Sequence, residues 1–106
     1  MVLFEDFKKL ELRVAEIESV TLHPNADRLY VLGIKVGEER KTVVAGIRKH
    51  YSEEELRGKK VVVVNNLEPS VIRGVESQGM LLAASLEDAL TLVTPERPIA
   101  SGAVVR

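Results

Sequence analysis

One short helix, with strand-like segments on both sides of it, constrains the fold of this chain more than any other feature. Ser52 can cap a helix start, and Glu55 three residues later completes a Ser-x-x-Glu capping box. Gly58 then ends the helix early. The three glutamates 53–55 also favour the positive end of the helix dipole, so they need no catalytic explanation. The sequence therefore predicts one small helix set among strands.

The flanking segments carry strand patterns. Apolar residues at 30, 32, 34 and 36 alternate with a second set, and 41–47 returns after a compact turn at 37–40. Val61–Val64 is a continuous β-branched run, as expected of a strand covered on both faces. Residues 80–84 are the expected fifth strand. Two further short strands are expected at 90–93 and 103–105.

The first strand is expected to be long and bent. It runs from about Leu10 to Leu22, and its alternation slips at Ala15-Glu16 as it would at a β-bulge. Three strands, a short helix and two strands are the order of an all-β, five-stranded Greek-key OB-fold barrel, here with a C-terminal extension. A small sandwich or an SH3-like barrel is the competing fold, and the helix between strands three and four favours the OB fold. The 106 residues suit a single domain.

Several kinds of chemistry are excluded by what the sequence lacks. There is no cysteine, and His23 and His50 lie in expected surface loops, so no structural metal site is predicted. Glycine-rich phosphate loops and a Gly-x-Ser-x-Gly nucleophile motif are absent. We therefore expect no catalytic residues and no cofactor. No apolar run reaches membrane-spanning length, so we expect a soluble cytoplasmic domain without a membrane partner.

Charge is distributed unevenly along a nearly neutral chain. The formal net charge is −1, yet the segment 35–60 holds eight cationic and five acidic side chains. This pattern fits a basic patch for a polyanion, but it equally fits an ordinary solvated surface. Only two phenylalanines and two tyrosines are present, and no tryptophan. Any nucleic acid would therefore be recognised by its backbone and shape more than by stacked bases.

The stretch Arg73–Ser85 is the main candidate for a functional site. It begins as a glycine-punctuated polar loop and passes at Gly79 into an apolar run. Ser77 offers a hydrogen-bonding hydroxyl. Met80 is either a core residue or a flexible exposed contact.

A series of motifs runs through almost the whole chain. They are Asp6-Phe7-x-Lys9-Leu10-x-Leu12-Arg13-Val14, His23-Pro24-Asn25-Ala26-Asp27-x-Leu29, Val44-Ala45-Gly46-Ile47, Tyr51-Ser52-x-Glu54-Glu55-Leu56-x-Gly58-Lys59, Asn65-x-Leu67-x-Pro69 and Arg73-Gly74-Val75-Glu76-Ser77-Gln78-Gly79-Met80-Leu81-Leu82-Ala83-Ala84. Together they resemble the tRNA-binding domain found at the C-terminus of methionyl-tRNA synthetases or as their β-subunit. The same domain occurs in free-standing tRNA-binding proteins and in the endothelial-monocyte-activating polypeptide.

The resemblance implies a non-catalytic module that increases the tRNA affinity of a methionyl-tRNA synthetase. The catalytic body would lie in the same chain or in a partner chain. The family's tRNA-contacting serine and methionine correspond to Ser77 and Met80. Residues expected to contact tRNA phosphates or to lie beside that loop are Lys35, Arg40, Lys41, Arg48, Asn65 and Arg73. The resemblance also implies a homodimer, formed here by the flanking segments 1–9 and about 86–106 of the domain 1–106.

Two other functions stay open. Chaperone-like relatives of this fold bind peptides, although they generally lack the Glu-Ser-x-Gly-Met loop. The domain could also serve purely to dimerise a larger synthetase.

Overall fold

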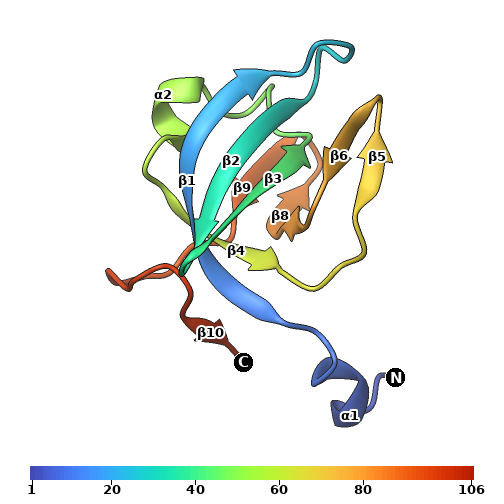
Figure 1. The fold of residues 1–106 in the computed structure, drawn as a ribbon, viewed down its shortest axis with the longest axis vertical. Coiled ribbons are helices and arrows are strands. Elements are labelled where there is room, and N and C mark those ends of the chain that lie inside the picture. The colour runs from blue at the N-terminus through green and yellow to red at the C-terminus, as the bar shows by residue number, and fades with distance from the viewer.

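The structure, a computed structural model, describes residues 1–106 and is built around one curled antiparallel sheet (Figure 1). Its strands lie in the order β3-β2-β1-β4-β7, with β10 paired to the start of β1. These strands are β1 (Leu12–Leu22), β2 (Tyr30–Val36), β3 (Glu39–Ala45), β4 (Lys60–Val64), β7 (Met80–Leu81) and β10 (Val104–Val105). The short helix α2 (Glu53–Leu56) lies between β3 and β4. The predicted OB-like barrel, with its helix at that position, is confirmed.

The core lies on the concave face of this sheet. The residues of β2 that alternate in the sequence, Tyr30, Leu32, Ile34 and Val36, are all buried there. Complete burial of an aliphatic side chain contributes about 1.5 to 3 kcal/mol. The alternation therefore fixes which face of β2 points inward, because a slip of one residue would expose the whole set.

The predicted bulge at Ala15-Glu16 is wrong. Val14 and Ala15 are both buried because the start of β1 is covered on both faces. Leu12 packs on the outer face with Val62, Val64 and the C-terminal Val105. The register with β2 instead shifts between Ile17 and Ser19.

The hairpin of β2 and β3 is confirmed, with a shorter turn than expected. Its register runs from Tyr30 opposite Ala45 to Val36 opposite Glu39. Gly37 at φ 62° provides the left-handed conformation that such a tight connection needs.

The capping box of α2 forms as predicted. The Ser52 hydroxyl accepts a 3.2 Å hydrogen bond from the amide of Glu55, and the Glu55 carboxylate accepts a 2.9 Å bond from the amide of Ser52. Leu56 is fully buried, so the helix is held by one apolar anchor as well as by its cap.

The segment before β7 is not a loop, as the sequence suggested, but a hairpin of β5 (Ser70–Ile72) and β6 (Val75–Ser77). Its two-residue turn places Arg73 at φ 52° and Gly74 at φ 92°. Positive φ at both central residues defines a type I′ turn, which matches the twist of a hairpin.

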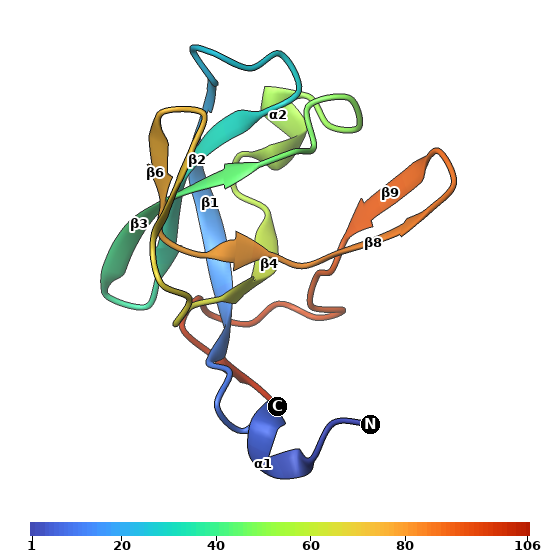
Figure 2. The same cartoon turned by 90° about the vertical axis from the view of Figure 1, so that its right-hand side faces the viewer.

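The expected strand 80–84 is also divided. Its second half becomes β8 (Ala83–Leu86), which pairs with β9 (Ala89–Leu92) in a hairpin that projects from the barrel (Figure 2).

The two ends of the chain lie near each other at one end of the molecule (Figure 1). Helix α1 (Phe4–Phe7) stands outside the barrel, and none of its residues is buried. No helix is long and apolar enough to cross a membrane.

Candidate nucleic-acid interface

Ser77 is buried, and its hydroxyl joins two parts of the barrel. Its Oγ accepts a 3.0 Å hydrogen bond from the amide of Val44 on β3 and donates a 3.1 Å bond to the carbonyl of Gly79. Next to it, Gln78 bonds Thr42 twice, through its side-chain oxygen and through its own amide, both at 2.8 Å. These bonds attach the segment after β6 to the free edge of β3. The predicted contact residue Ser77 thus has its hydroxyl engaged inside the protein.

Met80 is exposed, with 49% of its surface accessible. It lies at the start of β7 opposite Val64 of β4. The preceding Gly79 allows this close approach, because a Cβ there would lie 3.1 Å from the carbonyl oxygen of Val64. The side chain is therefore held at the surface by a tightly packed backbone, and it is not part of the core.

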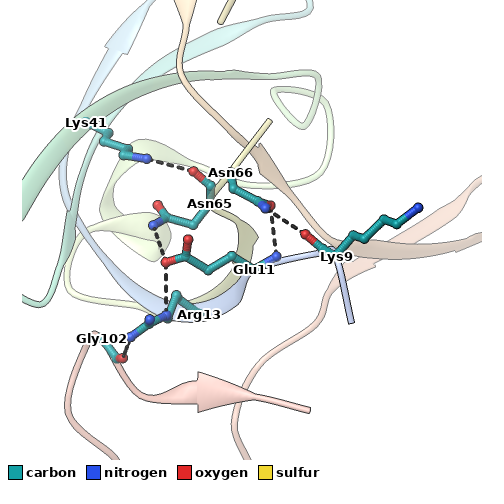
Figure 3. A network of polar contacts seen from close by, with 7 residues as sticks. All are labelled: Lys9, Glu11, Arg13, Lys41, Asn65, Asn66 and Gly102. Atoms are coloured by element: carbon teal, nitrogen blue, oxygen red, sulfur yellow. Dashed lines mark hydrogen bonds and ion pairs between the residues drawn. The ribbon is translucent and has the colours of Figure 1, made fainter. Parts of the chain in front are cut away.

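A polar network starts at Asn65, which follows the strand partner of Met80, and its members are drawn in Figure 3. The Lys41 ammonium donates a 2.7 Å hydrogen bond to the backbone carbonyl of Asn65, the residue after Val64. The buried side chain of Asn65 donates a 3.1 Å bond to Glu11, which forms a 3.2 Å ion pair with Arg13. We call Lys41, Asn65 and Met80 the Met80 edge.

The same network continues into both terminal segments. Arg13 donates a 2.9 Å bond to the carbonyl of Gly102, and Asn66 donates a 2.7 Å bond to the carbonyl of Lys9 (Figure 3). Asn66 also accepts a 2.8 Å bond from the amide of Glu11. The Met80 edge is thereby connected to the beginning and to the end of the chain.

Next to Lys41, with which Arg40 lines a shared hollow, Lys35 and Arg40 form a second group. They face each other across β2 and β3, and Lys35 also lies opposite Glu16 of β1. Arg40 is paired with Glu18 at 3.0 Å. Acidic neighbours thus offset much of the positive charge that the sequence suggested for these strands.

Arg48 and Arg73 form a third group at the end of the barrel away from α1. Arg73 donates a 3.2 Å bond to the carbonyl of Asn25, whose side chain donates a 3.1 Å bond back to the carbonyl of Arg73. Arg48 donates a 3.5 Å bond to the carbonyl of Ala26. The eight predicted site residues therefore fall into three groups, and two of the eight, Ser77 and Asn65, are buried.

His23 corrects the expectation of two surface histidines. It is 5% exposed, its Nδ1 accepts a 3.0 Å bond from the amide of Asn25, and its Nε2 lies 3.0 Å from the carbonyl of Ile72. Since Nδ1 accepts, Nε2 must carry the proton and donate. His50 is exposed, as expected.

Sequence reasoning missed the structural roles of Glu11, Asn66 and Gln78. The one available signal was the pair Asn65-Asn66 after a buried strand, since buried amides generally require partners. Nothing in the local pattern around Glu11 indicated that its carboxylate would meet Asn65. No group of three or more histidine, aspartate or glutamate side chains gathers as a metal site would require.

Residues 12–104 match the family model described as "Putative tRNA binding domain". A methionine–tRNA ligase of Pyrococcus horikoshii is 52% identical over 105 residues, which are 99% of this chain and 14% of that protein. A methionine–tRNA ligase of Deinococcus radiodurans is 48% identical over 108 residues, which are 100% of this chain and 16% of the enzyme. The chain thus spans about one seventh of the length of these curated relatives.

Among solved structures, a protein from Pyrococcus horikoshii described as related to methionyl-tRNA synthetase superposes with a TM-score of 0.92 at 34% identity. The match covers 100% of this chain and 98% of the other. The chaperone CsaA of Bacillus anthracis superposes with a TM-score of 0.91 at 30% identity, covering 100% and 99%.

Proposed function

We propose a function from one premise: this chain belongs to the tRNA-binding domain family. Residues 1–106 act as a single non-catalytic tRNA-binding module that increases the affinity of a methionyl-tRNA synthetase for tRNA. It works in the cytoplasm, with the catalytic body in the same chain or in a partner chain. A tethered module raises the effective concentration of tRNA near the catalytic body without adding a catalytic residue.

The observation that carries this proposal is the exposed position of Met80 beside Lys41 and Asn65. A flexible thioether at a rigid edge can adapt to a base or a sugar, and the Lys41 ammonium can meet a neighbouring phosphate. Asn65 and the engaged hydroxyl of Ser77 fix the backbone on which these side chains stand. Ser77 therefore acts as a positioning residue.

The other predicted cations would contribute phosphate contacts of different strength. Lys35 and Arg40 must compete with Glu16 and Glu18, so their contribution is expected to be small. Arg48 and Arg73 have only carbonyl partners and keep their charge available.

The terminal segments 1–9 and about 86–106 are the proposed dimer interface. Together with residues 10–13 and Asn66 they line a hollow of about 740 Å³, and half of its lining residues are hydrophobic, among them Phe4, Phe7 and Val105. Large apolar side chains of the first turn remain exposed, Phe4 at 70% and Leu3 at 69%. A second copy that covers these residues would remove apolar surface from water.

The test is tRNA binding by the wild-type protein at several salt concentrations. Affinity should fall as salt rises, because each phosphate contact releases counterions, with a slope of about 0.7 to 0.9 per contact in the logarithmic plot. Met80→Glu should weaken binding, because it places an acid among the phosphates, while the circular dichroism spectrum stays unchanged. Salt-independent affinity, or no binding at low salt, would refute the proposal.

A peptide-binding, chaperone-like function is the second candidate, and the superposition on CsaA favours it. A competition experiment separates the two functions: strong peptide binding that excess tRNA fails to displace would reverse the ranking. Gel filtration alongside the tRNA measurement addresses pure dimerisation, which predicts a dimer without detectable tRNA binding.

A further inference from the structure

Three arginines gather at the end of the barrel opposite α1, and none of them has an acidic partner. They are Arg28, Arg48 and Arg73, whereas the four ion pairs of the structure use other cations. Arg28 lies in the loop that follows His23, is exposed and donates no side-chain hydrogen bond. Its guanidinium is therefore available to a ligand.

Arg28 and Arg73 line a hollow of about 390 Å³ together with residues 25–27 and Leu29. We call it the arginine hollow. Arg73 is anchored to the rim by its reciprocal bonds with Asn25, and Arg48 by its bond to Ala26. Each of these two guanidiniums uses one N–H for its anchor, so the remaining donors stay free. Arginine donors have a fixed fork geometry that matches phosphate oxygens.

The hollow is held in one shape before any ligand arrives. His23 bonds the amide of Asn25 on one side and the carbonyl of Ile72 on the other, which ties the loop to the hairpin β5-β6. The amide of Arg48 also bonds the carbonyl of Arg28 at 3.4 Å. Such preorganisation lowers the entropy lost when a ligand binds.

We propose that the arginine hollow binds backbone phosphates of tRNA, with Arg28 as a contact residue beside Arg48 and Arg73. This inference rests on the proposed tRNA-binding function. Asp27 is the one acidic side chain of the lining and stands against Arg28 and Arg73, so the lining is net positive. An acidic peptide fits less well, because the apolar lining consists only of the partly buried Ala26 and Leu29 and offers no deep anchor.

The hollow and the Met80 edge would bind different parts of one RNA. The turn Arg73-Gly74 lies at the end of the molecule away from α1 in both views (Figures 1 and 2). The network of the Met80 edge continues to Lys9, just after α1 (Figure 3). A bound tRNA would then extend along the barrel, with phosphates at one end and the Met80 contact nearer the other.

The experiment measures the affinity of the full chain for fluorescently labelled tRNA over a range of salt. Arg28→Gln should raise Kd about threefold to tenfold and reduce the salt slope by about one contact, because one phosphate partner is lost. Asp27→Asn should lower Kd, because it removes the one repelling carboxylate. Arg57→Gln is the matched control with the same charge change, at the residue after α2 and outside all the proposed sites. It should leave Kd within about twofold, as expected of a surface ion pair.

Equal effects of Arg28→Gln and Arg57→Gln would overturn the arginine hollow while leaving tRNA binding itself intact. If the wild-type protein does not bind tRNA at low salt, both the proposed function and this inference are wrong. A second readout does not depend on variants: addition of tRNA to ¹⁵N-labelled protein should shift or broaden the amides of residues 25–29 and Gly74. If an acidic peptide perturbs those amides and tRNA does not, the hollow is a peptide site and the proposal is wrong.

Discussion

The side-chain amide of Asn65 donates a 3.1 Å hydrogen bond to the carboxylate of Glu11 and so joins the end of β4 to the N-terminal segment. Asn65 is 6% exposed, and its side-chain oxygen has no partner. Asn65 thus accepts a hydrogen bond from Lys41 with its backbone carbonyl and donates one to Glu11 with its side chain. The arrangement of the Met80 edge consequently depends on how the terminal segment is placed.

Asn65→Asp tests this link directly. It replaces the donor by a buried carboxylate next to the partly exposed carboxylate of Glu11, and a buried polar group left without its partner costs about 1 to 3 kcal/mol. The pKa of the new carboxyl should be raised, so the loss of stability is full at neutral pH and diminishes as pH falls below that raised pKa. Urea unfolding at pH 7 and pH 5 measures both effects. Asn66→Asp at the exposed neighbour is the comparison variant: it keeps the acceptor for the amide of Glu11 and loses only an exposed bond to Lys9, so it should cost less. Equal losses for both variants would contradict the assigned role of Asn65.

Ser77→Ala should destabilise the barrel. It leaves the amide of Val44 and the carbonyl of Gly79 without their partner, at a cost of about 1 to 3 kcal/mol. The side chain of Ser85 is exposed and makes no hydrogen bond, so Ser85→Ala is the matched control. Thermal or urea unfolding measures the difference. If Ser77→Ala is as stable as the control, the hydroxyl of Ser77 does not stabilise the barrel, and its predicted role as a direct tRNA contact remains.

Gly79→Ala should cost stability and disturb Met80. Its Cβ would lie 3.1 Å from the Val64 carbonyl oxygen and 3.3 Å from a methyl group of Val63, so β4 and β7 would have to separate. Overpacking of this kind typically costs about 1 to 3 kcal/mol. Gly46→Ala is the control, because its Cβ would meet Leu29 at an ordinary 3.6 Å. If both variants unfold at the same urea concentration, the close approach of β7 to β4 is not as tight as described.

His23→Ala should release the loop of residues 24–29 from the hairpin β5-β6. The change removes both bonds of the imidazole and empties a buried site, so we expect a loss of about 2 kcal/mol or more. Hydrogen exchange at the amide of Asn25 should accelerate beyond the change in global stability. His50→Ala, at the exposed histidine, should do neither. Unchanged protection of Asn25 in the His23 variant would show that the loop is held by other contacts.

The sequence predicted those parts of the fold whose signals are local. The alternation in β2 and the capping box of Ser52 and Glu55 act within a few residues, and both formed as expected. The turn of β5-β6 was missed because Arg73 adopts a positive φ, and an arginine gives no indication of that conformation in the sequence. Similarly, the double coverage of Val14 and Ala15 depends on packing from distant parts of the chain, and no alternation within β1 reveals that packing.

The candidate site divides in the same way. Sequence reasoning found Met80 and the cations, but not their surroundings. Ser77 binds Val44, 33 residues earlier in the chain, and Asn65 binds Glu11, 54 residues earlier. Which cations remain free of acidic neighbours likewise depends on strand register, as the pairing of Arg40 with Glu18 shows. Residue type identified possible contacts, whereas tertiary structure decided which of them are engaged within the protein.

Glu55→Gln should remove a pH-dependent contribution to stability. Hydrogen bonds from the amide and hydroxyl of Ser52 lower the pKa of the Glu55 carboxyl from its ordinary value of 4.5. A lowered pKa means that the folded state favours the ionised form, so the stabilisation is present above pH 4.5 and disappears as pH falls through the lowered pKa. The wild type should therefore melt at a higher temperature than Glu55→Gln at pH 7, and this gap should narrow as pH falls from 4.5 to 3. The side chain of Glu54 makes no hydrogen bond, so Glu54→Gln should melt close to the wild type at both pH values. A gap between wild type and Glu55→Gln that persists unchanged at pH 3 would mean that the charge of Glu55 does not stabilise the start of α2.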